Sequence, residues 1–134
     1  MANIHQFDEN VRRDKAMAME TLSDSSNTPE YFSMASYDLA VFLIETGTLT
    51  AAAAITATIW ESDGTTPQAT SVSQAGYQTD DDGFVLQIRG EELSVNSGYS
   101  LVGILVTETA DQNAVVEVIL LRMRARFKQA TMPA

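Results

Sequence analysis

The sequence predicts an all-β domain: an antiparallel β-sandwich, jelly-roll-like or a small barrel, with an extended N-terminal arm. Five segments have the length and the apolar, β-branched composition of strands, and they span residues 37–46, 55–61, 84–89, 99–107 and 114–128. The connections between them are short and polar, with turn residues such as Gly, Pro, Asn and Asp. No segment has the periodicity of a long helix, which favours a sandwich or barrel.

The chain of 134 residues fits a single domain that spans residues 1–134. A domain of this size buries roughly two thirds of its unfolded surface, so it needs no disulfide or metal in order to fold. The chain contains no cysteine, which excludes a disulfide framework, thiol catalysis and cysteine metal sites. We expect neither a cofactor nor a metal.

Residues 1–27 allow two interpretations, an arm or a strand of the domain. Residues 8–15 are charged and are typical of an arm. Residues 16–22 combine good helix formers with an alternation of small and large side chains, so a helix and a strand are both open. A polar turn cluster follows at residues 23–29, and residues 31–35 fit a short strand or a bridging segment.

The two segments in the middle of the chain differ in pattern. Residues 37–46 are apolar on both faces at their centre, as expected for a strand inside a sandwich. Residues 55–61 alternate, which points Ile55, Ala57 and Ile59 inward and Thr56, Thr58 and Trp60 outward. After a turn at Asp63 and Gly64, residues 68–77 are polar and small, and they predict a loop with one weak strand near residues 70–73.

The last segment, residues 114–128, begins as a nearly continuous apolar run and ends in strict alternation. Side chains alternate between the two faces of a strand, so Met123, Ala125 and Phe127 share one face. The other face carries Arg122, Arg124, Arg126 and Lys128. We expect this strand to begin buried on both faces and to end with its basic face exposed.

The formal charge of −10, from 18 acidic and 8 basic residues, disfavours binding to nucleic acid or to anionic membranes. The apolar runs are also far shorter than the ~20 residues of a membrane helix. Except for Arg89, the basic residues lie near the two ends of the chain: Arg12, Arg13, Lys15, Arg122, Arg124, Arg126 and Lys128. If the two ends meet in space, they form one basic region on an acidic protein.

This basic group has two interpretations. Charged side chains on a sheet edge prevent aggregation between sheets and need no partner. Alternatively, the group docks on an acidic protein surface. Nucleic-acid binding is least favoured, since a few cations on a protein of net charge −10 form a poor track for phosphates.

The sequence offers little for catalysis. Residues 80–83, Asp-Asp-Asp-Gly, invite a calcium interpretation but lack the spacing of a calcium loop, so solvation is the simpler reading. Asp63 beside Trp60 fits a carbohydrate-binding loop and equally an ordinary hairpin end. A Ser–His–Asp site would have to recruit His5, which is the only histidine. We predict that the protein is not an enzyme.

The order of strands and turns resembles that of short virion proteins of tailed phages, encoded among the head genes. The resemblance begins at residue 31. It comprises a Tyr-Asp-Leu-Ala-Val-Phe strand, a strand ending in a Glu-Ser-Asp-Gly turn, a Gly-Tyr-x-x-Val-Gly-x-x-Val-Thr strand and a final apolar strand that turns basic. These are residues 37–42, 60–64, 98–107 and 115–128.

The resemblance implies a β-sandwich subunit that acts as a capsid decoration or cement protein. Such a protein is made in the host cytoplasm and binds the outer surface of the virion head, with the major capsid protein as its partner, often as a homotrimer. The seven basic residues would then face the shell, and residues 1–27 would reach a neighbouring subunit. Two alternatives stay open: another virion part, such as a tail or head–tail connector subunit, and a carbohydrate-binding or receptor-binding module.

Overall fold

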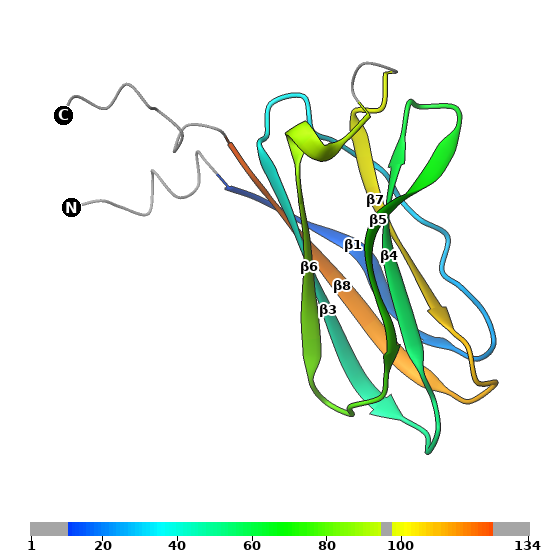
Figure 1. The fold of residues 1–134 in the computed structure, drawn as a ribbon. Helices are drawn as coiled ribbons and strands as arrows, with labels where there is room; N and C mark the ends of the chain where they lie inside the picture. The colour runs from blue at the N-terminus through cyan, green and yellow to red at the C-terminus, as the bar shows by residue number, and fades with distance from the viewer. Residues whose placement is uncertain (1–10, 95–97, 125–134) are drawn as a thin grey trace, which may run out of the picture.

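The computed structural model describes residues 11–94 and 98–124, which form two four-stranded sheets packed face to face (Figure 1). Sheet A contains, in spatial order, β1 (Val11–Leu22), β8 (Ala114–Met123), β3 (Leu39–Leu49) and β6 (Gly83–Arg89). Sheet B contains β2 (Phe32–Ser33), β7 (Leu101–Glu108), β4 (Ile55–Ser62) and β5 (Pro67–Tyr77). One turn of 3-10 helix, η1 (Gly90–Glu92), follows β6.

The strands pair as if one long hairpin had been folded over on itself. The pairs β1–β8, β2–β7, β3–β6 and β4–β5 are all antiparallel. An eight-stranded jelly roll has the two sheet orders seen here, β1-β8-β3-β6 and β2-β7-β4-β5. The predicted fold class is therefore confirmed. The five predicted strands correspond to β3, β4, β6, β7 and β8.

The N-terminal segment is the first correction. Within the described residues, the arm expected at residues 1–27 is instead β1, an edge strand of sheet A, followed by its connection to β2. The strand interpretation of residues 16–22 is therefore confirmed and the helix interpretation is wrong. Tertiary pairing with β8 outweighs the helix propensity of the Ala and Met residues.

The second correction concerns β5. It is an 11-residue strand, whereas the sequence predicted a loop with one short strand. Because β5 lies at the edge of sheet B and is exposed along most of its length, its side chains need not be apolar. Its register against β4 shifts twice, and the Thr70 hydroxyl donates to the Ile59 carbonyl at 2.7 Å.

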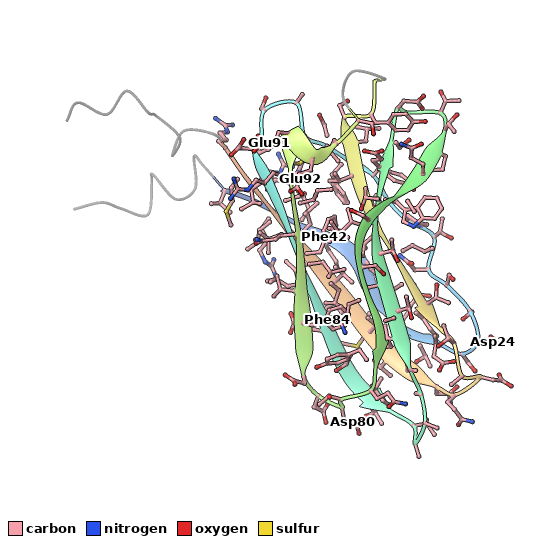
Figure 2. The ribbon with its side chains drawn as sticks, in the orientation of Figure 1. Asp24, Phe42, Asp80, Phe84, Glu91 and Glu92 are labelled. Carbon is pink, nitrogen blue, oxygen red and sulfur yellow. The ribbon has the colours of Figure 1, made fainter. Side chains whose placement is uncertain are left out.

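The core fills the space between the sheets with side chains that alternate inward along each strand. Phe42 and Ile44 of β3 and Ile55 and Ile59 of β4 are buried, and Phe42 lies between the two layers in Figure 2. The predicted inward face of β4 is thus confirmed. Each such side chain contributes roughly 1.5–3 kcal/mol by leaving water.

A buried carboxylate connects the loops at one end of the sandwich. This end is the one far from Val11 and Met123. Glu108 of β7 accepts hydrogen bonds from four backbone N–H groups, those of Asp24 at 2.9 Å, Ala54 at 3.1 Å, Ala110 at 2.9 Å and Gln112 at 3.0 Å. Burial raises the pKa of Glu108, but these four donors outweigh it and lower the pKa to about 2. One side chain therefore joins the β1–β2, β3–β4 and β7–β8 connections.

Candidate interaction surface

The two ends of the described chain meet because β1 pairs with β8. Arg12 lies opposite Arg122, Arg13 opposite Leu121 and Lys15 opposite Ile119. The two basic ends of the chain therefore meet in space at these residues. Arg126 and Lys128 lie outside the described residues.

The predicted exposure of Arg122 is wrong: its residue surface is only 7% exposed. Val116, Val118 and Leu120 of β8 face the core, and Arg122 continues the same alternation into the space between the sheets. The guanidinium donates from Nη1 to the Ser33 carbonyl at 2.7 Å and from Nη2 to Asp14 Oδ2 at 2.6 Å. Arg122 thus connects the last strand to β1 and β2.

Aromatic rings complete the surroundings of this guanidinium. Its central carbon lies 4.8 Å from the ring centre of Tyr37 and 5.4 Å from that of Phe32. Cation–π contacts gain strength when the cation is desolvated, and a buried ion pair needs such additional partners to offset its desolvation. Arg122 is therefore a structural residue that closes one end of the sandwich, and it is not available to dock on a shell.

Two exposed arginines flank this buried pair. Arg12 Nε lies 3.6 Å from Asp14 Oδ1, and the guanidinium of Arg124 lies 5.9 Å from the ring centre of Tyr37. Arg12, Asp14, Arg122 and Arg124, which we call the arginine cluster, carry a formal charge of +2 from three cations and one carboxylate. The cluster lies at the end of the sandwich where β1 begins and β8 ends.

Arg13 and Lys15 belong to a different surface. They lie opposite outward-facing residues of β8, so their side chains share the outer face of sheet A. Lys15 Nζ lies 3.3 Å from Glu117 Oε2. The described basic residues therefore do not form one docking surface but divide between the arginine cluster and this outer face.

The outer face of sheet A is apolar at its centre, a feature that was not expected from the sequence. Along β3, buried side chains alternate with side chains that point outward. The outward ones are Leu39, Val41 and Leu43, and the buried ones are Ala40, Phe42 and Ile44. The strand register places them opposite Met123, Leu121 and Ile119 of β8, and Val85 of β6 lies opposite Leu43 and is 54% exposed. We call this set the apolar stripe: Leu39, Val41, Leu43, Val85, Ile119, Leu121 and Met123.

Beyond the apolar stripe, the outer face of sheet A carries carboxylates. They lie at the end of the sheet that is far from the arginine cluster. Glu45 of β3 lies directly opposite Glu117 of β8. A shallow hollow of about 590 Å³ borders Glu45, Asp81 and Asp82, and a smaller one of about 120 Å³ lies between Glu45 and Met19. The outer face of sheet A is thus basic beside the stripe and acidic beyond it.

Two acidic residues at the end of β4, Asp63 and Glu61, have structural contacts. The Asp63 carboxylate accepts the N–H groups of Thr65 and Thr66 at 2.8 and 2.7 Å, which lowers its pKa. Glu61 is buried and accepts the Ser94 N–H and hydroxyl, both at 2.9 Å. Within residues 11–94 and 98–124, no three His, Cys, Asp or Glu residues are grouped to hold a metal ion. Nor does that part of the chain include a helix long and apolar enough to span a membrane.

Trp60 lies on the outer face of sheet B, directly across from Gly103. A Cβ atom at Gly103 would lie 2.8 Å from the Glu30 carbonyl oxygen and 2.9 Å from the Tyr31 ring. The Glu30–Tyr31 segment therefore packs directly on β7 beside Trp60. This close approach is the physical reason for a glycine at position 103.

No family model matches this sequence, and no curated protein matches it. Among solved structures, the fold is similar to that of the prophage-derived protein YomS of SPBc2, at 15% identity and a TM-score of 0.50 over 84% of this chain and 93% of that chain. The disulfide-linked pili of Bacillus endospore appendages match at 15% identity and a TM-score of 0.49, over 86% and 88% of the two chains. Infectious bursal disease virus, strain Gx, matches at 10% identity and 0.48, over 86% of this chain and 32% of that chain. At this identity, the likeness to YomS shows a shared fold.

Proposed function

We propose that this chain is a virion structural protein without enzymatic activity, namely a decoration or cement protein on the outer surface of a phage head. The sequence resemblance to phage head proteins motivates this function, and the jelly-roll fold, shared with a prophage-derived protein, supports it. The observation that carries the proposal is the arginine cluster, a cationic end on a protein of net charge −10.

The arginine cluster suits attachment because its exposed cations rest on a rigid base. Arg122 is fixed by hydrogen bonds to two strands, and its partners Asp14 and Tyr37 in turn contact Arg12 and Arg124. The two exposed guanidinium groups therefore point to a partner surface that carries carboxylates, here the major capsid protein. Guanidinium groups bind carboxylates in a planar, bidentate geometry.

Each such contact is weak by itself. An exposed ion pair contributes about 0.2–1 kcal/mol, so a single copy would bind a shell only loosely. A decoration protein overcomes this by attaching through several linked copies, which raises the apparent affinity without any new contact. The rest of the domain, which is acidic, would face solvent. Its negative charge would repel other decorated phage heads. The homotrimer implied by the resemblance stays a prediction.

The test uses heads purified from a phage strain that lacks this gene, mixed with purified protein and sedimented. We expect Arg12→Glu and Arg124→Glu each to lower the bound fraction by about tenfold at subsaturating protein, since each replaces an attraction by a repulsion. Arg89→Glu is the matched control, because it makes the same change of charge at an exposed arginine outside the cluster. If all three variants bind like the original protein, the docking proposal is wrong.

A further inference from the structure

Three of the four edge strands of the sandwich are poorly suited to pair with a further strand. β2 is two residues long, and the registers of β1 and β5 against their neighbours each shift twice. Such short or irregular strands are the usual protection of a sheet edge. β6, at the edge of sheet A in Figure 1, instead pairs with β3 in one continuous register. Among the residues that the structure describes, β6 is therefore the open edge.

Hydrogen bonds at the two ends of β6 show which of its backbone groups face this edge. The Asp82 carbonyl accepts the Thr46 N–H of β3 at 2.8 Å, and the Gly90 N–H donates to the Asp38 carbonyl, just before β3, at 2.7 Å. Backbone groups of successive residues in a strand point to opposite sides. The groups of the even-numbered residues thus point to β3, and those of the odd-numbered residues from 83 to 89 point to the open edge.

Side chains of the chain itself cap both ends of this edge. The Tyr77 hydroxyl donates to the Gly83 carbonyl at 3.1 Å, and the Glu92 carboxylate accepts the Arg89 N–H at 2.8 Å. Between these caps, the other two odd-numbered residues form no backbone hydrogen bond toward the edge with any described residue. The centre of β6 therefore offers free donors and acceptors to an incoming strand.

We propose that the open edge of β6 pairs with β6 of a second copy of this chain. The two strands run antiparallel around a twofold axis at Leu86, so that Val85 of each copy lies opposite Gln87 of the other. Antiparallel residues placed in this way exchange two N–H···O bonds, and two such pairs satisfy all the free backbone groups at the centre of the edge. The contact is isologous, so it closes at two copies.

The same register places Arg89 of one copy against a complementary site of the other. Arg89 lies opposite Gly83, which leaves a gap in the outward row of side chains because it has none. Gly83 lines the hollow of about 590 Å³ that Glu45, Asp81 and Asp82 border, and Glu45 lies directly across from Gly83 on β3. Neighbouring strands are about 4.8 Å apart, so an arginine side chain that extends over Gly83 reaches the Glu45 carboxylate.

A second copy is the partner that fits, because this chain supplies both the cation and the carboxylates at matching positions. Within residues 11–94 and 98–124, Glu45, Asp81 and Asp82 take part in no ion pair. Arg89 has a loose one, with 3.8 Å between Nη1 and Glu91 Oε1 and both side chains about two thirds exposed. An exposed pair of this kind contributes little, so Arg89 exchanges it readily for the carboxylates of the partner.

Glu91 and Glu92 do not continue the row of Arg89, because they lie in η1, where the strand has ended (Figure 2). The arginine cluster also stays free, since β1 and β8 lie on the side of sheet A away from β6. The inference concerns the purified protein alone and does not rest on the proposed function. Head binding can be measured at concentrations below the dissociation constant of the pair, where Arg89→Glu stays a valid control.

The test measures the mass of the purified protein by light scattering behind a sizing column, over a range of concentrations. We expect a dimer that dissociates on dilution. Val85→Pro removes one N–H from the open edge and none from the ladder with β3, so the variant should fold and stay a monomer. Val85→Thr keeps the N–H and should still form the dimer. A monomer or a trimer for the original protein overturns the proposal, as does a folded Val85→Pro protein that forms the dimer.

Charge reversal tests the register and does not depend on the folding of Val85→Pro. Arg89→Glu and Glu45→Arg should each raise the dissociation constant about tenfold, because each change occurs twice in the interface. The double variant, which restores the net charge, should bind more tightly than either single variant. Arg13→Glu makes the same change of charge on β1, away from β6, and should alter the dissociation constant by less than about twofold. If Arg89→Glu weakens the dimer no more than Arg13→Glu does, or the double variant is weaker than both single ones, the register is wrong.

Discussion

Asp14 and Arg122 join the first and last strands of the sandwich through an ion pair with 2.6 Å between Oδ2 and Nη2. The pair is almost buried: the side chain of Arg122 is 9% exposed and that of Asp14 is 19% exposed. The guanidinium also reaches the Ser33 carbonyl of β2, so a single side chain spans both sheets. Closure of the jelly roll at this end thus depends on a charge, whereas the centre of the sandwich depends on apolar packing.

Asp14→Ala should destabilise the fold by about 2–3 kcal/mol. The change leaves the Arg122 charge buried without its counter-ion, and the loss of one partner of a buried pair typically costs about 3–5 kcal/mol. Asp14 is partly exposed, and aromatic rings surround Arg122. We therefore expect a loss of stability at or below the lower end of this range. Urea unfolding of the original protein and the variant measures this difference.

Arg122→Met is the control for this pair, because it removes the charge and keeps an apolar side chain of similar length. With Met at position 122, Asp14→Ala should cost much less than in the original protein. Equal costs of Asp14→Ala in both backgrounds would mean that the pair contributes nothing to stability.

The strands that form the sandwich could be predicted because their pattern is local. In β4, apolar residues alternate with Thr, and the structure buries Ile55, Ala57 and Ile59 as expected. β5 could not be predicted in the same way. Its hydrogen bonds to β4 define it as a strand, and its exposed side chains leave no apolar alternation to detect.

The error at Arg122 has a physical origin in β8. A strand that is apolar on both faces does not reveal which set of side chains faces the core, so the basic face could not be assigned. Pairing with β3 fixes the assignment: Leu120 faces inward opposite Phe42, and Arg122 follows inward opposite Ala40. The same ambiguity explains why the apolar stripe could not be predicted, since an apolar second face on β3 and β8 is typical of strands inside a sandwich.

Glu108 should make the stability of the fold depend on pH in acid. Its pKa is about 2 in the folded protein, below the ordinary value of 4.5. The folded state therefore holds the charged form more strongly than the unfolded state does. Its stabilising contribution is complete above pH 4.5 and is lost as the pH falls toward 2.

Glu108→Gln separates this contribution from that of other carboxyl groups. The variant should be less stable at neutral pH by at least about 2 kcal/mol, because an amide accepts the four backbone N–H groups poorly. Its unfolding free energy should also fall less steeply than that of the original protein between pH 4.5 and 2. Urea unfolding at a series of pH values measures both, and parallel pH profiles for the two proteins would refute the assigned role.

Gly103→Ala should destabilise the protein by about 1–3 kcal/mol, the usual cost of overpacking. The added methyl group would lie 2.8 Å from the Glu30 carbonyl oxygen, and backbone at this position has little freedom to move. Gly47→Ala is the control, because its nearest neighbour is the Val115 side chain at 3.2 Å, which adjusts more easily. Thermal unfolding compares the two variants. A Gly103→Ala protein as stable as Gly47→Ala would show that the segment before β2 does not pack tightly on β7.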